Sequence, residues 1–406
     1  MSRVSFPPVN EQMDLIRRGV EEIIPEEELA ERLAASSASG TPLRVKLGAD
    51  PSRPDLHIGH AVVLQKMRDF QDLGHQGILI IGDFTAMIGD PSGKSKTRPA
   101  LTLEETRRNG QTYFDQATKI LSSKRLTITF NSEWLAPMNF AEVISLASTY
   151  TVSQMLERDD FSKRFEAEVP ISLHELLYPL VQARDSVAIN ADVELGGTDQ
   201  KFNLLVGRAL QRTLGQTPQT IITCPLLVGT DGVEKMSKSL DNYVALNDFP
   251  GDMYGKTLSI PDTLMADWFR LVLFYTPEQV AELTTGLDKG EIHPRDLKRR
   301  LARELVARYT SAKTAEKAEA EFDKIFIAKD VPDRIDERSV AASTPLVQLI
   351  VEAGMAPSKN EARRLIQGGG VSIDGEKIAD VNALYEPKES AVLKVGKRKF
   401  VRLVKG

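Results

Sequence analysis

Two histidines and two lysines lie in segments whose composition suits the binding of phosphate groups. His57 and His60 are three residues apart at the start of a predicted helix, with Gly59 between them. At this spacing both imidazoles share one helix face, beside backbone N–H groups that lack partners within the helix, and such a site can hold an anion. A zinc pair is the competing interpretation, but the other three histidines are scattered and the single cysteine, Cys224, is distant in sequence. The plain alternative is two polar residues that cap a helix.

The second basic pair lies in a segment rich in glycine and serine. Gly229 to Asn242 reads GTDGVEKMSKSLDN and carries Lys235 and Lys238. Two lysines on a mobile loop can close over a polyphosphate and neutralise the charge that grows on a leaving group. An ordinary solvated basic turn is the alternative interpretation.

A third segment, GDFTAMIGDPSGKSKT, resembles a phosphate-binding P-loop without matching it. Three residues separate Gly89 from Gly93, one fewer than the P-loop pattern requires, so a kinase or GTPase is not favoured. The same turn displays Asp90, whose carboxylate can bind an ammonium group or can simply form the turn.

Short apolar runs alternate with helical patterns through the first half of the chain, and these elements must position the three segments. The runs at 43–47, 77–81, 126–130 and 220–228 predict buried strands, and residues 59–73 have helical spacing. Strands separated by helices predict an α/β domain with a doubly wound, Rossmann-like parallel sheet. In such sheets ligands bind beyond the carboxyl ends of the strands, where the three segments lie.

Composition predicts a multidomain globular protein. The chain has 406 residues, of which 41% are hydrophobic and 27% charged, which excludes a disordered or disulfide-framework protein. Neither a signal peptide nor an apolar run of bilayer length is present, so we expect a cytoplasmic protein without a membrane partner. A single cysteine agrees with a reducing compartment.

Charge is unevenly distributed. The net charge of −5 argues against a nucleic-acid partner, but residues 346–406 hold 11 Lys and Arg against 7 Asp and Glu. The remaining residues hold 41 against 50. A basic tail on an acidic body predicts an RNA-binding or membrane-surface module, with a plain solvated surface as the alternative.

Taken together, the two basic segments resemble the class I aminoacyl-tRNA synthetases. The HIGH signature of that family is present as His57-Ile58-Gly59-His60, and its KMSKS signature begins at Lys235, about 175 residues later. The resemblance extends to the bacterial tyrosyl-tRNA synthetases over almost the whole chain. Their tyrosine-pocket helix is matched by Tyr178, Gln182 and Asp185, and their Gly-Gly-x-Asp-Gln segment by Gly196 to Gln200.

The resemblance also implies a domain plan. Residues 1–245 would form the catalytic domain, with a dimer-forming insertion near 136–169, and residues 246–328 a helical anticodon-region domain. A linker at 329–344 would lead to a small α+β domain at 345–406, similar to the S-four family of RNA-binding domains. The implied enzyme is a homodimer that joins tyrosine to tRNA(Tyr), with ATP as a substrate accompanied by Mg²⁺ and without a structural metal.

The resemblance assigns residues to each substrate. Those implied to bind ATP are His57, Gly59, His60, Gly197, Asp199, Lys235, Ser237 and Lys238, of which the two histidines and two lysines are catalytic. Those implied to bind tyrosine are Asp90, Tyr178, Gln182, Asp185 and Gln200. Those implied to bind tRNA are Lys359, Arg363 and Arg364. Asp199 would hold the ribose, Asp90 with Tyr178 and Gln182 the ammonium group, and Asp185 the phenol hydroxyl.

The chain departs from the best-known subgroup at three positions. Lys46 and Leu47 stand where that subgroup has Tyr-Cys, and Lys201 follows the Asp-Gln pair in place of a tryptophan. The second group that recognises the phenol hydroxyl, and the ribose contact, are therefore open. Two alternatives are a tryptophan-specific enzyme and a catalytically silent relative that acts as an RNA-binding regulator.

Overall fold

The computed structural model describes residues 5–51, 55–91, 102–326, 336–396 and 399–406. The chain divides into two compact units, Met1–Tyr309 and Thr310–Gly406, and each is described on its own.

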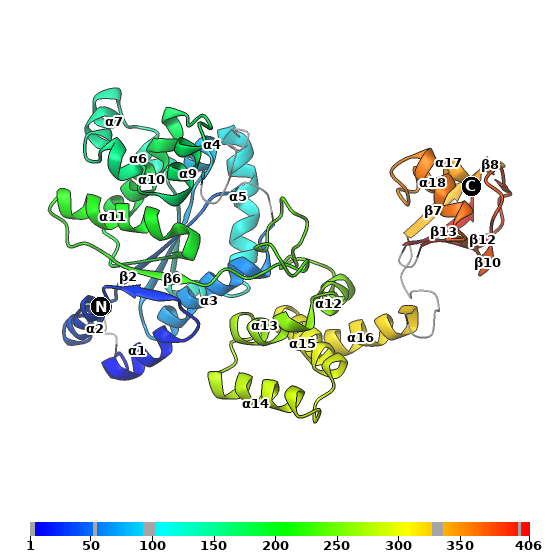
Figure 1. The fold of residues 1–406 in the computed structure, drawn as a ribbon, viewed down its shortest axis with the longest axis horizontal. Helices are drawn as coiled ribbons and strands as arrows, with labels where there is room; N and C mark the ends of the chain where they lie inside the picture. Colours follow the sequence, from blue (N-terminus) through cyan, green and yellow to red (C-terminus); the bar gives the residue numbers. More distant parts are fainter. Residues whose placement is uncertain (1–4, 52–54, 92–101, 327–335, 397–398) are drawn as a thin grey trace. The chain divides into compact units, whose positions relative to one another are not determined.

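A six-stranded sheet forms the centre of the first unit, in the order β1-β6-β5-β2-β3-β4 (Figure 1). Its strands are β1 (Glu22–Ile24), β2 (Arg44–Ala49), β3 (Gln76–Ile81), β4 (Leu126–Phe130), β5 (Val193–Gly197) and β6 (Thr220–Cys224). Strands β2 to β6 pair in parallel, and β1 pairs with β6 in the antiparallel direction. The prediction of a wholly parallel sheet is therefore wrong at this edge, where the strand is only three residues long and carries little pattern.

Two differences in the strands have physical reasons. The predicted strand at 220–228 ends at Cys224, because Pro225 follows and cannot donate to the ladder. Strand β5 was not predicted, since its sequence VELGG interrupts the apolar pattern with Glu194 and two glycines. Both flanking residues of Glu194 are nevertheless buried, as is Glu194 itself.

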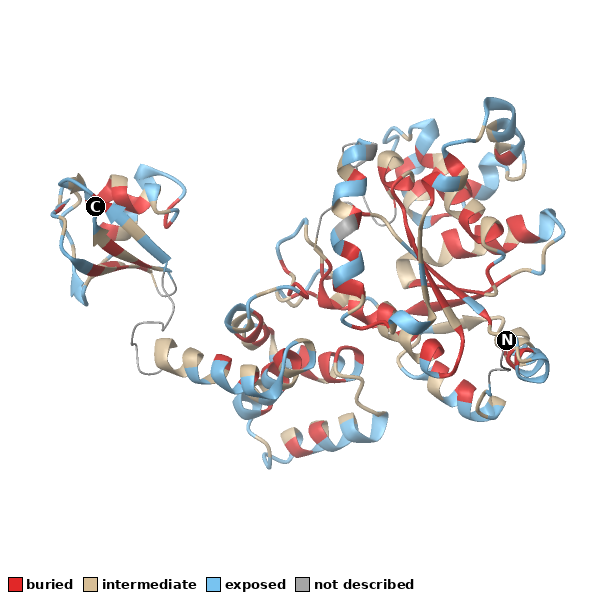
Figure 2. Cartoon of the chain, turned by 180° about the vertical axis from the view of Figure 1, so that it is seen from behind, coloured by how far each residue is buried: buried red, intermediate tan, exposed pale blue. Residues whose placement is uncertain are grey.

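The helices of the first unit cover both faces of the sheet. Figure 1 shows α3 and α5 on one side of the strands and α10 and α11 on the other. The helices before residue 250 are α1 (Val9–Arg17), α2 (Glu26–Ser39), α3 (Ile58–Asp72), α4 (Thr85–Ile88), α5 (Leu103–Ala117), α6 (Ser132–Leu135), α7 (Phe140–Ala147), α8 (Val152–Met155), α9 (Asp159–Glu166), α10 (Leu173–Ala188) and α11 (Lys201–Thr213). Helix α3 buries one apolar face that includes Ala61, Met67 and Phe70. Figure 2 shows this burial concentrated along the strands and the helix faces that meet them.

The sheet reverses its direction of winding between β2 and β5. These strands are neighbours, although most of the domain separates them in sequence. Successive strands β3 and β4 extend the sheet away from β2 on one side, while β6 extends it from β5 on the other. Such a switch point leaves a crevice at the carboxyl ends of the two central strands, and that is where ligands bind in sheets of this kind.

Helices follow the sheet, as the amphipathic patterns predict. They are α12 (Pro250–Leu258), α13 (Met265–Leu271), α14 (Pro277–Asp288) and α15 (Pro294–Tyr309). Trp268, Phe269 and Tyr254 are fully buried at their centre, which gives this helical part an aromatic core of its own.

The second unit begins with α16 (Ala312–Phe326) and continues into a small α+β fold. A five-stranded sheet has the order β10-β9-β12-β13-β7. Its strands are β7 (Asp336–Val340), β9 (Val371–Ile373), β10 (Glu376–Lys377), β12 (Ser390–Val395) and β13 (Lys399–Lys405). A second pairing joins β8 (Thr344–Pro345) to β11 (Leu384–Tyr385), and α17 (Leu346–Glu352) and α18 (Lys359–Gln367) complete the unit. Ile350, Ile366, Leu393 and Leu403 lie in its core.

The five-stranded sheet contains part of the segment 329–344, which was expected to be a linker. Residues 336–340 form strand β7, which pairs in parallel with β13, and residues 329–335 lie outside the described part of the chain. The sequence DERSV has only one apolar residue, and only Val340 is buried, so the strand carries no hydrophobic pattern. Among the described residues, none of the helices combines the length and apolar character that crossing a membrane requires.

Candidate active site

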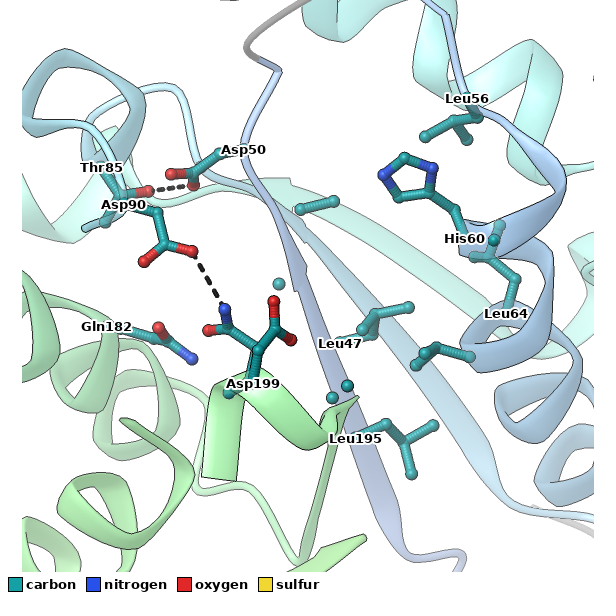
Figure 3. Close-up of a pocket in the computed structure, with 18 of the residues that line it drawn as sticks. Leu47, Asp50, Leu56, His60, Leu64, Thr85, Asp90, Gln182, Leu195 and Asp199 are labelled. Atoms are coloured by element: carbon teal, nitrogen blue, oxygen red, sulfur yellow. Dashed lines mark hydrogen bonds between the residues drawn. The ribbon is translucent and has the colours of Figure 1, made fainter. Parts of the chain in front are cut away.

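The crevice at the switch point is a cavity of about 730 Å³. Every residue predicted to bind ATP or tyrosine lines it. Figure 3 shows Asp50, Asp90 and Gln182 on one side of the cavity and His60 on the other, with Leu47 between them and Leu195 below. Segments that are distant in sequence therefore meet at one place, as the strand-end positions predict.

The two histidines of the cavity are neutral and packed together. His57 is the N-cap residue of α3, and its backbone N–H donates to Nδ1 of His60 at 3.2 Å. The ring centroids are 3.8 Å apart. Burial lowers the pKa of His60 to about 3, and the charge of Lys238 adds to the effect. Burial also lowers the pKa of His57 well below its ordinary value. At neutral pH the pair can offer N–H groups, but no positive charge, to a phosphate.

His57 has spare hydrogen-bonding capacity in the cavity wall. Its Nδ1 is buried and finds no hydrogen-bond partner among the described residues. A Cβ at position 59 would lie 2.9 Å from that nitrogen, so Gly59 leaves the imidazole its space. A larger residue there would move the ring from its position beside His60.

The two lysines reach opposite walls of the cavity. Lys235 Nζ donates to Asp199 Oδ2 at 2.7 Å, next to the end of β5. Lys238 Nζ donates to the backbone carbonyl of Asp55 and to the hydroxyl of Tyr113, the latter at 3.2 Å. The KMSKS segment thus bridges the β5 side and the α3 side, and it brings the ammonium group of Lys238 close to the neutral histidines.

The backbone of the KMSKS segment is held by local hydrogen bonds. Ser237 N donates to Asn242 Oδ1 at 2.8 Å, and Met236 N donates to the carbonyl of Leu227. Met236 is buried and anchors the segment, while Lys235, Ser237 and Lys238 line the cavity. Gly197 is required on the facing side, because a Cβ there would lie 2.7 Å from Asp199 Oδ1 and 2.8 Å from Leu226.

An aspartate that sequence analysis did not single out lies at the end of β2. Tyr178 donates its hydroxyl hydrogen to Asp50 Oδ2 at 2.8 Å, and Thr85 donates to Asp50 Oδ1 at 2.6 Å. Burial raises the pKa of the Asp50 carboxyl to about 7, and the neighbouring Asp90 carboxylate adds to the rise. The available signal was an acidic residue three positions after a predicted buried strand.

Asp90 lies beside this group and is itself held in place. Gln200 Nε2 donates to Asp90 Oδ2 at 3.0 Å, and Arg158 lies 3.8 Å from Asp90 Oδ1. Two carboxyl groups and the Tyr178 oxygen therefore form an acceptor-rich region that suits an ammonium group. Tyr178 can accept from such a group, because its own hydrogen goes to Asp50.

Asp185 forms a second acceptor site deeper in the cavity. Trp134 Nε1 donates to Asp185 Oδ1 at 2.8 Å, and Asn131 Nδ2 donates to Asp185 Oδ2 at 3.3 Å. Burial raises the pKa of Asp185 to about 6, although Lys46 and the two donors oppose the rise. Each carboxylate oxygen has a second lone pair, so Asp185 can still accept from a hydroxyl group. Sequence analysis missed Asn131, which precedes the one-turn helix α6, and Trp134, which lies in it.

The three residues that differ from the best-known subgroup lie at different places relative to the cavity. Leu47 lines the cavity, so an apolar side chain stands where that subgroup has a cysteine. Lys201 pairs with Glu22 at 2.6 Å and is half exposed, and it is not among the residues that line the cavity. Lys46 is fully buried and pairs with Glu194, and it likewise does not line the cavity.

The residues predicted to bind tRNA lie on one helix of the second unit. Lys359, Arg363 and Arg364 are exposed on α18, whose N-cap Ser358 accepts from the backbone N–H of Glu361. Arg364 pairs with Glu361 at 2.8 Å while most of its side chain stays in solvent. Their exposure suits contact with a phosphate backbone.

Comparison with known proteins identifies the family. Residues 38–327 match the family model of class I tRNA synthetases (W and Y), and residues 321–403 match the SYY-like C-terminal domain of tyrosine–tRNA ligases. The tyrosine–tRNA ligase of Chlorobaculum tepidum is 56% identical over 98% of both chains, and that of Thermotoga maritima is 53% identical, again over 98% of both. The tyrosyl-tRNA synthetase of Archaeoglobus fulgidus, solved with L-tyrosine, has the same fold at a TM-score of 0.64 and 24% identity, covering 77% of this chain and 99% of that one.

The fold, the two signatures and the family model together define a class I tRNA synthetase. Within that class, the chain belongs to the tyrosine–tRNA ligase family. The alternatives of a tryptophan-specific enzyme and of a silent regulator are therefore set aside.

Proposed function

We propose that the cavity activates L-tyrosine with ATP, releasing pyrophosphate, and then transfers the tyrosyl group to the 3′ end of tRNA(Tyr). One observation carries the proposal. The two signature segments and the acceptor groups of α10 line a single cavity, so a nucleotide and an amino acid can be held side by side. Positioning of this kind supplies much of the acceleration when two substrates react.

In the first step a carboxylate oxygen of tyrosine attacks the α-phosphorus of ATP. The bond from that phosphorus to the bridging oxygen breaks, and pyrophosphate leaves with the electron pair. Such a displacement needs charge stabilisation more than proton transfer. His57 and His60 donate neutral N–H groups to phosphate oxygens, and Lys235 and Lys238 neutralise the departing pyrophosphate. Mg²⁺ accompanying ATP as part of the substrate would supply further positive charge at its phosphates.

The two acceptor sites orient the amino acid. Asp90 and Gln200, with Tyr178 and Gln182, hold the ammonium end, and Asp50 supports that group through Tyr178. Asp185 accepts the hydrogen of the phenol hydroxyl. Phenylalanine would displace water from this buried carboxylate without offering a hydrogen-bond donor in exchange. The unpaired acceptor disfavours the binding of phenylalanine. Asp199 holds the ribose of ATP once Lys235 has moved to the phosphates.

The test of this function is ATP–pyrophosphate exchange with each amino acid in turn. We expect exchange with tyrosine alone, because only its hydroxyl satisfies Asp185. Comparable exchange with tryptophan or phenylalanine would contradict the assignment of the cavity to tyrosine.

Asp185→Ala should lower the preference for tyrosine over phenylalanine by about 10- to 100-fold, the effect of a lost hydrogen bond to a charged group. The ratio of kcat/KM for the two amino acids measures it. Asp267→Ala, at an exposed carboxylate of α13, is the matched control and should leave the ratio unchanged. An unchanged ratio in Asp185→Ala would remove this residue from the hydroxyl site.

We also propose that residues 136–169 form the interface of a homodimer. This segment exposes five large apolar side chains, and exposed apolar patches of this kind mark interfaces. They are Phe140, Ile144, Val152, Phe165 and Val169. Phe140 and Ile144 are four residues apart on α7, so they present one apolar face.

Phe140→Glu combined with Ile144→Glu should convert the dimer to a monomer, because two charges would be buried at the interface without partners. Light scattering coupled to size-exclusion chromatography measures the mass. Phe249→Glu, at an aromatic residue 74% exposed outside this segment, is the matched control. A dimer that persists in the double variant would place the interface elsewhere.

A further inference from the structure

A buried ion pair lies directly behind the tyrosine end of the cavity. Lys46 on β2 and Glu194 on β5 join at 2.7 Å between Nζ and Oε1, with side chains 0% and 1% exposed. The strands are neighbours and pair Lys46 with Glu194 in register. Neither side chain is among the residues that line the cavity in the described part of the chain. Any effect of the pair on substrate must therefore pass through other residues.

The ammonium group of Lys46 is fully engaged by protein acceptors. Besides Glu194, it donates to the backbone carbonyl of Gln182 at 3.1 Å and to Ser186 Oγ at 2.8 Å. Ser186 in turn donates to Glu194 Oε2 at 3.0 Å, and Gln219 Nε2 donates to the same oxygen. An ammonium group has three hydrogens, so Lys46 has none left for a ligand.

The packing around this network leaves no room for a side chain at Gly207. A Cβ at Gly207 of α11 would lie 2.7 Å from Gln219 Nε2, 3.2 Å from Glu194 Oε2 and 3.3 Å from Ser186 Oγ. The network is thus enclosed between the sheet and α11. Hydrogen bonds from Lys46 to the carbonyl of Gln182 and to Ser186 Oγ join it to α10.

The network holds the turn of α10 that faces the substrate. Lys46 contacts residues 182 and 186 of that helix, and Asp185 lies between them. Gln182 Nε2 is 3.4 Å from Glu194 Oε1, so the pair also orients this amide. Both Gln182 and Asp185 line the cavity.

The two charges act on Asp185 in opposite directions. The positive charge of Lys46 lowers the pKa of Asp185, and the negative charge of Glu194 raises it. The other groups that face Asp185 are the donors Asn131 and Trp134 beside and on α6, together with the carboxyl group of Asp50 at the end of β2 and the hydroxyl of Tyr178 on α10. Among the charged members of this set, Lys46 alone is positive.

We propose that Lys46 and Glu194 are positioning residues for tyrosine recognition: they hold the 182–186 turn of α10, from which Gln182 and Asp185 face the cavity. The inference rests on the proposed function, in which ionised Asp185 accepts from the phenol hydroxyl. Lys46 thus takes part in recognition of the hydroxyl without touching the substrate.

The sign of the pH dependence follows from the charge of the acceptor. Tyrosine preference is present above the pKa of Asp185, which is about 6, and is lost as the pH falls through it. Removing the positive charge of Lys46 moves the midpoint of this loss to higher pH. Removing the negative charge of Glu194 moves it to lower pH.

The experiment measures equilibrium binding of tyrosine and of phenylalanine to the full-length protein, without ATP, from about pH 5 to pH 8. The variants are Lys46→Met, Glu194→Gln and Lys46→Arg. We expect the midpoint to rise in Lys46→Met, fall in Glu194→Gln and stay near the original value in Lys46→Arg. A rise of about two pH units would reduce the ionised fraction at pH 7, and with it the preference for tyrosine, by about tenfold.

A second buried ion pair on the same helix is the matched control. Arg164 and Glu175 join at 2.6 Å, with both side chains buried, and Glu175 is on α10 but outside the cavity lining. Glu175→Gln should leave the midpoint unchanged, whatever it does to thermal stability. If Lys46→Met does not fold, Glu194→Gln carries the test, since glutamine can still accept from Lys46.

The proposal is overturned if the midpoint in Glu194→Gln stays in place or rises, or if Glu175→Gln shifts it equally. Failure of the proposed function would be seen separately, as wild-type exchange that does not depend on tyrosine. A wild-type protein that is tyrosine-specific, with variants that do not move the midpoint, would reject only the role of the pair.

Discussion

Lys238→Ala is expected to slow tyrosyl-adenylate formation by about 100-fold or more, while tyrosine binding changes less than about twofold. Preorganised groups that stabilise developing charge contribute about 10²- to 10³-fold each when they are removed singly. Lys238 lines the cavity beside two histidines that carry no charge at neutral pH, so its ammonium group cannot be replaced by theirs. Pyrophosphate exchange measures the first quantity, and tyrosine titration without ATP measures the second.

Two further variants separate the charge of Lys238 from its structural contacts. Tyr113→Phe removes the hydroxyl that accepts from Lys238 at 3.2 Å but keeps the ammonium group, so it should slow exchange only slightly. Lys201→Ala removes a half-exposed lysine outside the cavity lining and should have no effect on exchange. Equal losses of tyrosine binding and of exchange in Lys238→Ala would contradict a role at the leaving group.

Removal of residues 336–406 is expected to lower tRNA charging by at least about 100-fold and to leave pyrophosphate exchange unchanged. The cut is placed before Asp336 because β7 belongs to the sheet of the second unit. The residues that line the cavity all lie in the first unit, so adenylate formation does not need the part removed. The basic excess of residues 346–406 supplies attraction to phosphates, which should also make binding of tRNA depend on salt.

A narrower variant tests the same module in the intact chain. Charge reversal at Lys359, Arg363 and Arg364, all exposed on α18, should weaken tRNA binding and reduce its salt dependence. Lys388→Glu reverses an exposed lysine on a different segment of the same unit and is the control. Charging that survives the removal of residues 336–406 would show that residues 1–335 are enough to hold tRNA.

The chemistry-bearing loops could be predicted from sequence because their signals are local. His57, His60 and the KMSKS lysines are contained in short segments at the ends of apolar runs, and the parallel sheet brings such ends together. The structure places all of them around one cavity. The division into an α/β sheet followed by helices could also be predicted, because it depends on apolar patterns within short segments.

The residues that were missed depend on partners distant in sequence. Asp50 accepts hydrogen bonds from Tyr178 and Thr85, and Trp134 donates to Asp185. Strand β5 was hidden because Glu194 reads as a surface residue until Lys46 is known to lie beside it. No single stretch of sequence contains such pairings.

The position of strand β7 in its sheet affects the order in which the two units can fold during synthesis. The sheet of the first unit has all its strands once Cys224 has been made, and the KMSKS segment is complete at Ser239. The second unit cannot assemble its sheet until β13 emerges, because that strand lies between β12 and β7 and bonds to both. A nascent chain can therefore complete the first sheet, with the cavity at its edge, before it has any means of completing the second. The two units become ordered at different times during synthesis.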